Sequence, residues 1–351
     1  MKKKKLPNTF DLLVASYDMN SFAEFFSKYE ITATNVGKST SNAFSYKNLS
    51  VEQAQFLLDN GLNPDMDCGF GYSAVAHQAD NKDVLELLIK NGADINLAVK
   101  SYNGNALARA CTTCNVQAAR NLLDAKASVD ITCGLDNKTL IDGVLAGCQN
   151  IYIPNALEIC KMLLQAGAKT SEKTKGYVEE IGKRFEFFRN NISADILPKL
   201  VEALAALYDL FNVTPVGPRV MNGIDEEIKV KQGNWQTQYE ELRHKLVPGR
   251  GKAETLQGEM IRIVGKITYE ILDNGGMNWD TEYKKMTNAL NGYLKQNVKM
   301  DTALVDEACN IVGHISSCSG KEELYRLTEL VVKWVTSNSM PKKLGEVDYI
   351  R

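Results

Sequence analysis

The chain repeats one short phrase four times: Leu-Leu-Asp-Asn-Gly at 57–61, Leu-Ile-Lys-Asn-Gly at 88–92, Leu-Leu-Asp-Ala-Lys at 122–126 and Leu-Leu-Gln-Ala-Gly at 163–167. The last residues of the phrases, at 61, 92, 126 and 167, stand 31, 34 and 41 positions apart. A repeat of this length is one supersecondary unit, and such units stack to share a continuous core. The sequence therefore predicts a row of stacked units between about residues 40 and 170.

The residues of each phrase have the spacing of an amphipathic helix that ends at the last position. In the second unit one helix face carries an apolar stripe made of Val84, Leu85, Leu87 and Leu88. Glycine follows the stripe in three of the four units, at Gly61, Gly92 and Gly167. A helix end favours glycine because the chain there adopts a left-handed backbone. We therefore predict that the leucines of the phrase form the core of the stack.

The clearest unit carries a resemblance to a known family. It opens with Gly-Tyr-Ser-Ala-Val-Ala at 71–76 and closes with Leu-Leu-Ile-Lys-Asn-Gly-Ala-Asp-Ile-Asn at 87–96. The closing segment resembles the second helix and the Gly-Ala-Asp-x-Asn turn of ankyrin repeats. The opening segment is similar to that family's Thr-Pro-Leu-His box, with Ser73, Ala74 and Val75 in place of the first three residues.

The other units depart further from the family pattern. The third opens at Asn105 without Thr, Pro or His, and Lys126 replaces its closing glycine. The fourth opens at Thr139 and has about seven extra residues around 148–154, whereas the first, near 42–65, is shorter. The resemblance covers about 130 residues, or about 165 if residues 9–31 form a degenerate cap. It implies a helical solenoid whose turns project as fingers and hold another protein.

The whole chain is predicted to be all-α: an ankyrin-repeat solenoid followed by a C-terminal helical bundle. At 351 residues it exceeds the usual size of one core, so two domains are expected. We predict a repeat stack with capping helices at 1–211, a Pro- and Gly-containing linker at 212–234, a helical domain at 235–340 and a tail at 341–351. Residues 1–8 and 31–45 read as tail and loop. The C-terminal helices are expected at 235–246, 252–273, 281–295, 302–316 and 321–337.

Composition excludes several classes of protein. There are 41 Lys and Arg against 43 Asp and Glu, and neither half of the chain is basic, so no nucleic-acid surface is indicated. No apolar run of about 18 residues exists, so no membrane span is predicted. The eight cysteines match no disulfide framework and favour a cytoplasmic location. The pair Cys111 and Cys114 lacks further ligands at metal-site spacing, so we predict no metal and no cofactor.

The predicted partner-binding residues lie mainly in the turns at 63–71, 94–104 and 130–138. They are Phe70, Tyr72, Lys100, Tyr102, Arg109, Asp136 and Lys138. Exposed aromatic side chains flanked by charges are typical of recognition surfaces. Alternatively, Tyr72 and Tyr102 pack between adjacent turns. The expected partner is another protein, and one sharper hypothesis is a bacterial immunity or sequestering role. A scaffold that spaces two partners is a further hypothesis.

A second set of polar residues lies in the C-terminal half. Residues 251–262 and 274–280 resemble a stretch of uncharacterised bacterial proteins, Gly-Lys-Ala-(Asp/Glu)-Thr-x-Gln-Gly-Glu followed by Asn-x-x-x-Asn-Trp-Asp. The candidate site residues are Glu254, Gln257, Glu259, Arg262, Asn278 and Asp280. They favour either acid-base catalysis on a substrate that the repeats recruit, or a polar network that locks the bundle. No catalytic residue is assigned. Gly258 and Gly265 share a helix face, which predicts that another backbone passes close to both.

Overall fold

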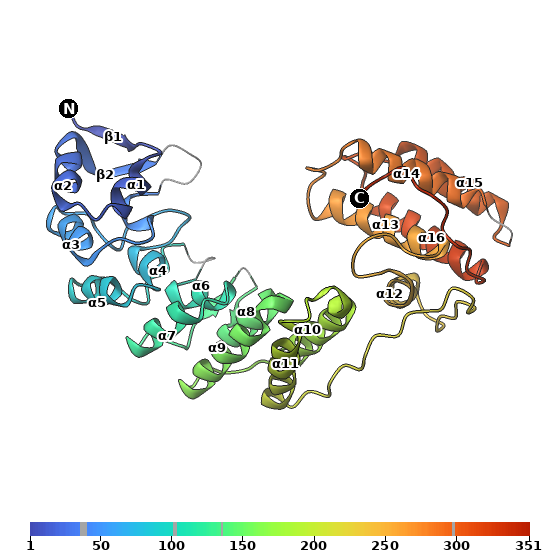
Figure 1. Cartoon of the computed structure of the whole chain (residues 1–351), viewed down its shortest axis with the longest axis horizontal. Coiled ribbons are helices and arrows are strands. Elements are labelled where there is room, and N and C mark those ends of the chain that lie inside the picture. Colours follow the sequence, from blue (N-terminus) through green and yellow to red (C-terminus); the bar gives the residue numbers. More distant parts are fainter. Residues whose placement is uncertain (36–40, 101–103, 135, 297–298) are drawn as a thin grey trace. The chain divides into compact units, whose positions relative to one another are not determined.

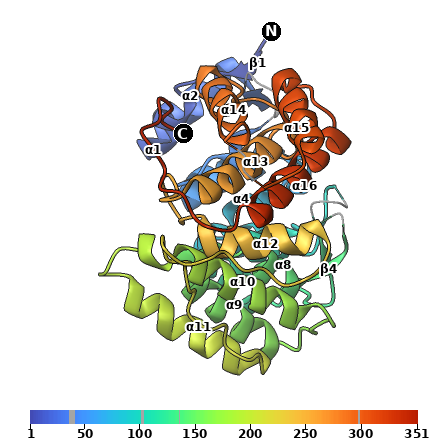
Figure 2. The ribbon, with the colours of Figure 1, turned by 90° about the vertical axis from the view of Figure 1, so that its right-hand side faces the viewer.

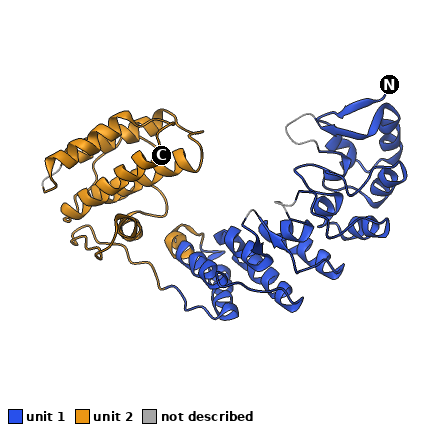
Figure 3. Ribbon diagram, turned by 180° about the vertical axis from the view of Figure 1, so that it is seen from behind, with its two compact units in different colours: residues 1–184, 194–216 blue, residues 185–193, 217–351 orange. Residues whose placement is uncertain are grey.

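The computed structural model describes residues 1–35, 41–100, 104–134, 136–296 and 299–351, and these divide into two compact units (Figure 3). Unit 1 comprises Met1–Arg184 and Ala194–Val216, and unit 2 comprises Phe185–Ser193 and Gly217–Arg351. Both units are built mainly from helices, as the sequence predicts.

Unit 1 contains the predicted row of helix pairs (Figure 1). The first helices of the pairs are the 3-10 turn η1 (Ala43–Ser45), α4 (Ala74–Gln78), α6 (Ala106–Thr112) and α8 (Leu140–Gly147). The second helices are α3 (Val51–Asp59), α5 (Lys82–Lys90), α7 (Val116–Asp124) and α9 (Ile153–Gln165), with the 3-10 turn η3 (Asn150–Tyr152) before α9. First helices pack on first helices and second helices on second helices, as in α4 on α6 and α3 on α5. This translational stacking confirms the solenoid.

All four phrase ends share one backbone conformation. Gly61, Gly92 and Gly167 have φ between 84° and 89°, and Lys126 has φ 66°. In each unit the next amide donates to the carbonyl five residues earlier, for example Ala93 to Leu88 at 3.0 Å and Ala127 to Leu122 at 2.9 Å. This bond satisfies a helix-terminal carbonyl and is the reason that the position needs a left-handed residue. Lys126 therefore occupies a position whose backbone favours glycine.

Asparagine side chains link successive repeats. Asn81 caps α5 by accepting from Val84, and its amide donates to the carbonyl of Leu49 in the preceding repeat at 3.1 Å. Asn155 donates in the same way to Cys114 at 3.2 Å. Because side-chain bonds of this kind recur along the stack, each repeat helps to position the next.

Two short sheets add to the helical stack. β1 (Lys3–Leu6) pairs in parallel with β2 (Tyr29–Asn35), and β3 (Thr132–Cys133) pairs with β4 (Lys138–Thr139). The expectation that residues 1–8 form a tail and 31–45 a loop is therefore wrong for both strands. Leu6 and Ala33 become buried, and β2 packs on α2 (Met19–Lys28), which forms the N-terminal cap together with α1 (Phe10–Ala15). Pairing between segments more than 20 residues apart leaves no local pattern in the sequence.

After the fourth repeat come α10 (Thr174–Phe188), the 3-10 turn η4 (Arg189–Asn191) and α11 (Leu197–Phe211), which packs on α9. The buried carboxylate of Asp142 in α8 accepts from the hydroxyls of Ser171 and Thr174, both at 2.6 Å. These bonds fix the start of α10 against the last repeat.

Unit 2 is a bundle of α12 (Trp235–Leu246), α13 (Leu256–Leu272), α14 (Thr281–Leu294), α15 (Thr302–His314) and α16 (Lys321–Ser337). All five predicted helices are confirmed. Figure 2 shows α13 to α16 together, with α12 below them in that view. Trp334 is fully buried, and its indole N–H donates to the carbonyl of Leu294 at 3.1 Å.

The two glycines of α13 have different neighbours. A Cβ at Gly258 would lie 2.7 Å from the carbonyl oxygen of Leu246, so a second backbone does pass close there. A Cβ at Gly265 would instead lie 2.2 Å from the hydroxyl of Tyr239, which is a side chain. The prediction of a close backbone is therefore confirmed for Gly258 and wrong for Gly265.

Candidate functional site

The finger turns of unit 1 are joined to each other by hydrogen bonds from backbone amides to side chains. The carboxylate of Asp65 accepts from the amide of Asp94 at 3.0 Å, and the side chain of Asn96 accepts from the amide of Ser128 at 2.8 Å. Lys100 adds an ion pair with Asp67 of the preceding turn at 3.7 Å. Successive fingers are thus held in a fixed order along one edge of the stack.

The turn before α4 holds one aromatic side chain in a strained and exposed position. Gly69, Phe70 and Gly71 all have positive φ, at 130°, 58° and 78°. The carboxylate of Asp67 accepts from the amides of Gly69 at 2.9 Å and Gly71 at 3.0 Å, which fixes this backbone. Phe70 itself is 67% exposed. A bulky residue with positive φ costs on the order of 1–3 kcal/mol, and such strain concentrates at functional sites.

Behind this turn lies a half-buried cluster of Tyr72, His77 and Arg109. The guanidinium of Arg109 lies 4.5 Å from the ring centre of Tyr72 and donates to the carbonyl of Ala76 at 2.9 Å. Arg109 belongs to α6 of the next repeat, so Tyr72 packs against the first helix of that repeat. This packing leaves Phe70 as the more exposed of the two aromatic side chains.

His77 connects the cluster to the strained turn. Its Nε2 lies 3.0 Å from the carbonyl oxygen of Gly69, and its Nδ1 lies 3.3 Å from Nη1 of Arg109. Since Arg109 can only donate, the ring is neutral with its proton on Nε2. Burial, and next the positive charge of Arg109, lower the pKa of His77 to about 4. A neutral His77 therefore anchors the carbonyl next to Phe70.

The remaining predicted contact residues have simpler surroundings. Asp136 is exposed and forms an ion pair with Lys138 at 2.8 Å, near the β3–β4 turn. Lys100 is exposed apart from its pair with Asp67. Tyr102 lies outside the described residues. Asp67 and His77 were not among the predicted contact residues. Asp67 could have been identified from the sequence, because an Asp shortly before a Gly-x-Gly segment is a turn signal.

Among the candidate polar residues of unit 2, Glu259 and Arg262 form a buried ion pair. Glu259 is fully buried and accepts from Nε and Nη2 of Arg262 at 2.7 and 2.6 Å, from the hydroxyl of Tyr349 at 2.6 Å and from the amide of Ala253 at 3.0 Å. Burial opposes its ionisation, but the bonds from Arg262 and Tyr349 outweigh burial and hold the pKa of Glu259 below its usual value. Both oxygens are used twice, so this carboxylate has no capacity left for a substrate.

The other candidates belong to separate contacts. Gln257 is buried and bonds to the backbone of Asn338, Met340 and Lys342, while Glu254 is exposed. Asn278 donates to Glu270.

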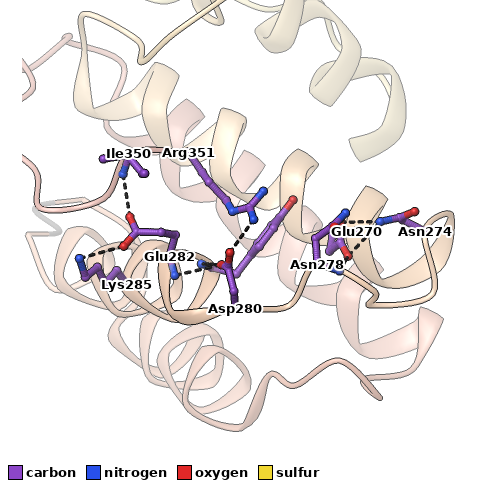
Figure 4. A network of polar contacts seen from close by, with 9 residues as sticks. Glu270, Asn274, Asn278, Asp280, Glu282, Lys285, Ile350 and Arg351 are labelled. Atoms are coloured by element: carbon purple, nitrogen blue, oxygen red, sulfur yellow. Dashed lines mark hydrogen bonds and ion pairs between the residues drawn. The ribbon is translucent and has the colours of Figure 1, made fainter.

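Asp280 caps α14 and accepts from Arg351 at 2.5 Å (Figure 4). The six residues therefore form several distinct sets of bonds. They connect α13 and α14 to the segment after α16, whose Tyr349 is 1% exposed although the sequence reads as a tail.

The cysteine pair of the third repeat lies in the interior. Cys111 is buried in α6, and Cys114, also buried, follows the end of that helix with φ 51°. Burial raises the pKa of the Cys111 thiol. Within the described ranges there is no group of three or more His, Cys, Asp or Glu side chains placed to hold a metal ion.

Part of the repeat region resembles known proteins. Residues 41–133 match the family model for ankyrin repeats in three copies. No curated protein matches the chain. A crystal structure of an ankyrin repeat domain from Acinetobacter baumannii is similar, with 19% sequence identity and a TM-score of 0.37. That alignment covers 55% of this chain and 96% of the other. The match to the family model is confined to residues 41–133, and ankyrin repeats generally act as protein-interaction modules.

A separate finding concerns membranes: among the described helices, none is both long enough and apolar enough to span a bilayer.

Proposed function

We propose that the protein binds another protein through the finger turns of unit 1, with Phe70 as the central contact. The observation that carries this proposal is the exposed, strained Phe70, held between two glycines by the carboxylate of Asp67. An aromatic side chain on a rigid turn loses little conformational freedom on binding, so its buried area converts efficiently into affinity.

Charged side chains of the fingers add specificity. Lys100 pairs with Asp67 of the turn that carries Phe70, whereas Asp136 and Lys138 belong to the β3–β4 hairpin further along the stack. Charged groups at the rim of an interface mainly select the partner and speed its association, so their individual effects on affinity are small.

Affinity purification of the full chain from its native cell tests this proposal. Wild type is compared with Phe70→Ala and with Ile151→Ala, because Ile151 is 56% exposed but lies in the insertion of the fourth repeat. We expect one stoichiometric partner with wild type and Ile151→Ala. Phe70→Ala should weaken binding by about 2 kcal/mol or more, as expected for a central aromatic contact. Equal recovery of the same partner by both variants would refute the assignment of Phe70.

The sharper form of the proposal is a sequestering or immunity role. It requires that the partner's own activity falls when the partner is bound. An activity assay of the purified partner, with and without the chain, tests this. A bound partner that stays fully active would remove the sequestering role and leave the interaction.

A further inference from the structure

Unit 2 contains a cavity of about 830 Å³, a volume within the range of small-molecule sites. Its lining is strongly positive: the basic residues are Arg243, Arg250, Arg262, Lys266 and Arg351. Among the described residues that line it, one is acidic, Glu240. Of the candidate site residues in this half of the chain, Arg262 alone belongs to the lining, so the cavity is a different site from the one that the sequence predicted.

Three of the five basic residues already have a carboxylate partner. Arg243 pairs with Glu240 at 3.3 Å, Arg262 with Glu259, and Arg351 with Asp280. The other two differ. Among the described residues, no side-chain hydrogen bond or ion pair joins Lys266 or Arg250 to a carboxylate, so these two cations of the lining have no acidic partner in contact.

Lys266 is the more informative of these two because it is half-buried. It lies one turn after Arg262 on α13, and both side chains reach the same cavity. Burial, and next the charges of Arg262 and Arg351, lower the pKa of Lys266. Gathering buried cations costs free energy, and a bound anion would offset that cost. Arg262 is held in place at the cavity wall, because its Nε and Nη2 donate to Glu259 and its Nη2 also donates to the carbonyl oxygen of Arg351.

The remaining walls of the cavity are rich in aromatic rings. They are formed by Phe187, Phe188, Tyr239, Tyr269 and Tyr283. Arg243 lies 4.6 Å from the ring centre of Phe187, and Arg351 lies 4.9 Å from that of Tyr283. Guanidinium groups stacked on rings in this way are held in place before any ligand arrives. The absence of a side chain at Gly265 allows Tyr239 to approach α13 at the cavity wall.

We propose that this cavity binds a small molecule that joins an oxyanion group, a phosphate or a carboxylate, to a flat ring. Lys266 binds the oxyanion with the neighbouring charge of Arg262, and the aromatic walls contact the ring. None of the residues that line this cavity belongs to the finger turns. The proposal can therefore be tested separately from the protein-binding role.

Titration with anilinonaphthalenesulfonate tests the proposal, because this probe joins an anion to flat rings and its fluorescence rises in an apolar site. The full chain is compared with Lys266→Met, which removes the charge, and with Lys266→Arg, which keeps it. The control variant is Lys333→Met, an exposed lysine on α16 that does not line the cavity. Circular dichroism of each variant confirms its fold. Competition with adenosine monophosphate, adenosine and benzoate separates phosphate ligands from carboxylate ligands.

We expect saturable binding that Lys266→Met weakens about tenfold or more and that Lys266→Arg and Lys333→Met leave within about twofold of wild type. Displacement by adenosine monophosphate but not adenosine indicates a phosphate ligand, and displacement by benzoate indicates a carboxylate ligand. Three results would overturn the proposal: no saturation below about 1 mM, unchanged binding by Lys266→Met, or equal binding of the uncharged analogue phenylnaphthylamine.

Discussion

The two units hold their polar groups in different ways. In unit 1 asparagine and aspartate side chains bond to the neighbouring repeat, as Asn81 does to Leu49, 32 positions away. In unit 2 the polar contacts join distant segments of the chain. Tyr349 donates to Glu259 from 90 positions away, and Gln257 bonds to Asn338 from 81. In unit 1 similar contacts recur from repeat to repeat and are largely exposed at the turns. In unit 2 each of these contacts occurs once and is buried.

This difference predicts different responses to mutation. Each repeat contacts mainly its neighbours, so the loss of one turn contact in unit 1 should have a small, local effect. In unit 2 the removal of one partner leaves a buried charge that no second copy of the contact can replace. All three tryptophans, Trp235, Trp279 and Trp334, lie in unit 2. Tryptophan fluorescence therefore reports the unfolding of unit 2, while circular dichroism reports both units.

The largest effect is expected for Glu259→Gln. The substitution keeps the shape of the side chain but leaves the buried guanidinium of Arg262 without a carboxylate. Loss of one partner of such a pair costs about 3–5 kcal/mol. Urea unfolding followed by tryptophan fluorescence measures this cost.

Glu254→Gln is the matched control, because Glu254 lies five residues earlier and is exposed. It should change the free energy of unfolding by less than about 0.5 kcal/mol. A cost below about 1 kcal/mol for Glu259→Gln would mean that water replaces the carboxylate, and the contrast between the units would then disappear.

The pH dependence of unit 1 should show an effect of intermediate size. Folding lowers the pKa of His77 from 6.5 to about 4, so between these values the unfolded chain binds a proton that the folded chain does not. Stability is thus full above about pH 6.5 and falls as the pH drops towards 4, by about 3 kcal/mol in total. The charged groups that act on the ring are Arg109 and Asp67.

Urea unfolding by circular dichroism at several pH values measures this loss, with His77→Gln as the reference without a titrating ring. The difference between the two proteins should shrink as the pH falls. The fluorescence transition of unit 2 should be the same in both. A constant difference from pH 6.5 to 4 would mean that His77 is already protonated in the folded chain.

The smallest effect is expected at Lys126, which ends the third repeated phrase where the other three end in glycine. Lys126→Gly removes the strain of a side chain at φ 66° and should stabilise unit 1 by about 1 kcal/mol. Gly92→Lys, at the equivalent position with φ 87°, should destabilise it by a similar amount. Thermal unfolding followed by circular dichroism tests both changes, and equal signs for the two would contradict a shared conformation at these positions.

Sequence reasoning succeeded where structure is local. The phrase that ends at Gly92 specified a helix, its cap and its period, and the helices of unit 2 followed from apolar spacing alone. It failed where contacts are distant. Nothing near Tyr349 indicates that its hydroxyl bonds to Glu259, and nothing near Lys3 indicates that β1 pairs with β2. The chemical character of residues 251–262 was visible, but their grouping into separate sets of bonds depends on segments remote in the chain.

The central claim is that the finger turns of unit 1 bind another protein through Phe70. Photo-crosslinking in the native cell tests this claim most directly. A photoreactive benzoylphenylalanine replaces Phe70 in one protein and Leu12, which is 66% exposed in the N-terminal cap, in the other. Our account predicts that the residue at position 70 crosslinks to one protein and that the residue at position 12 does not. Crosslinking of the same protein from position 12 but not from position 70 would contradict it.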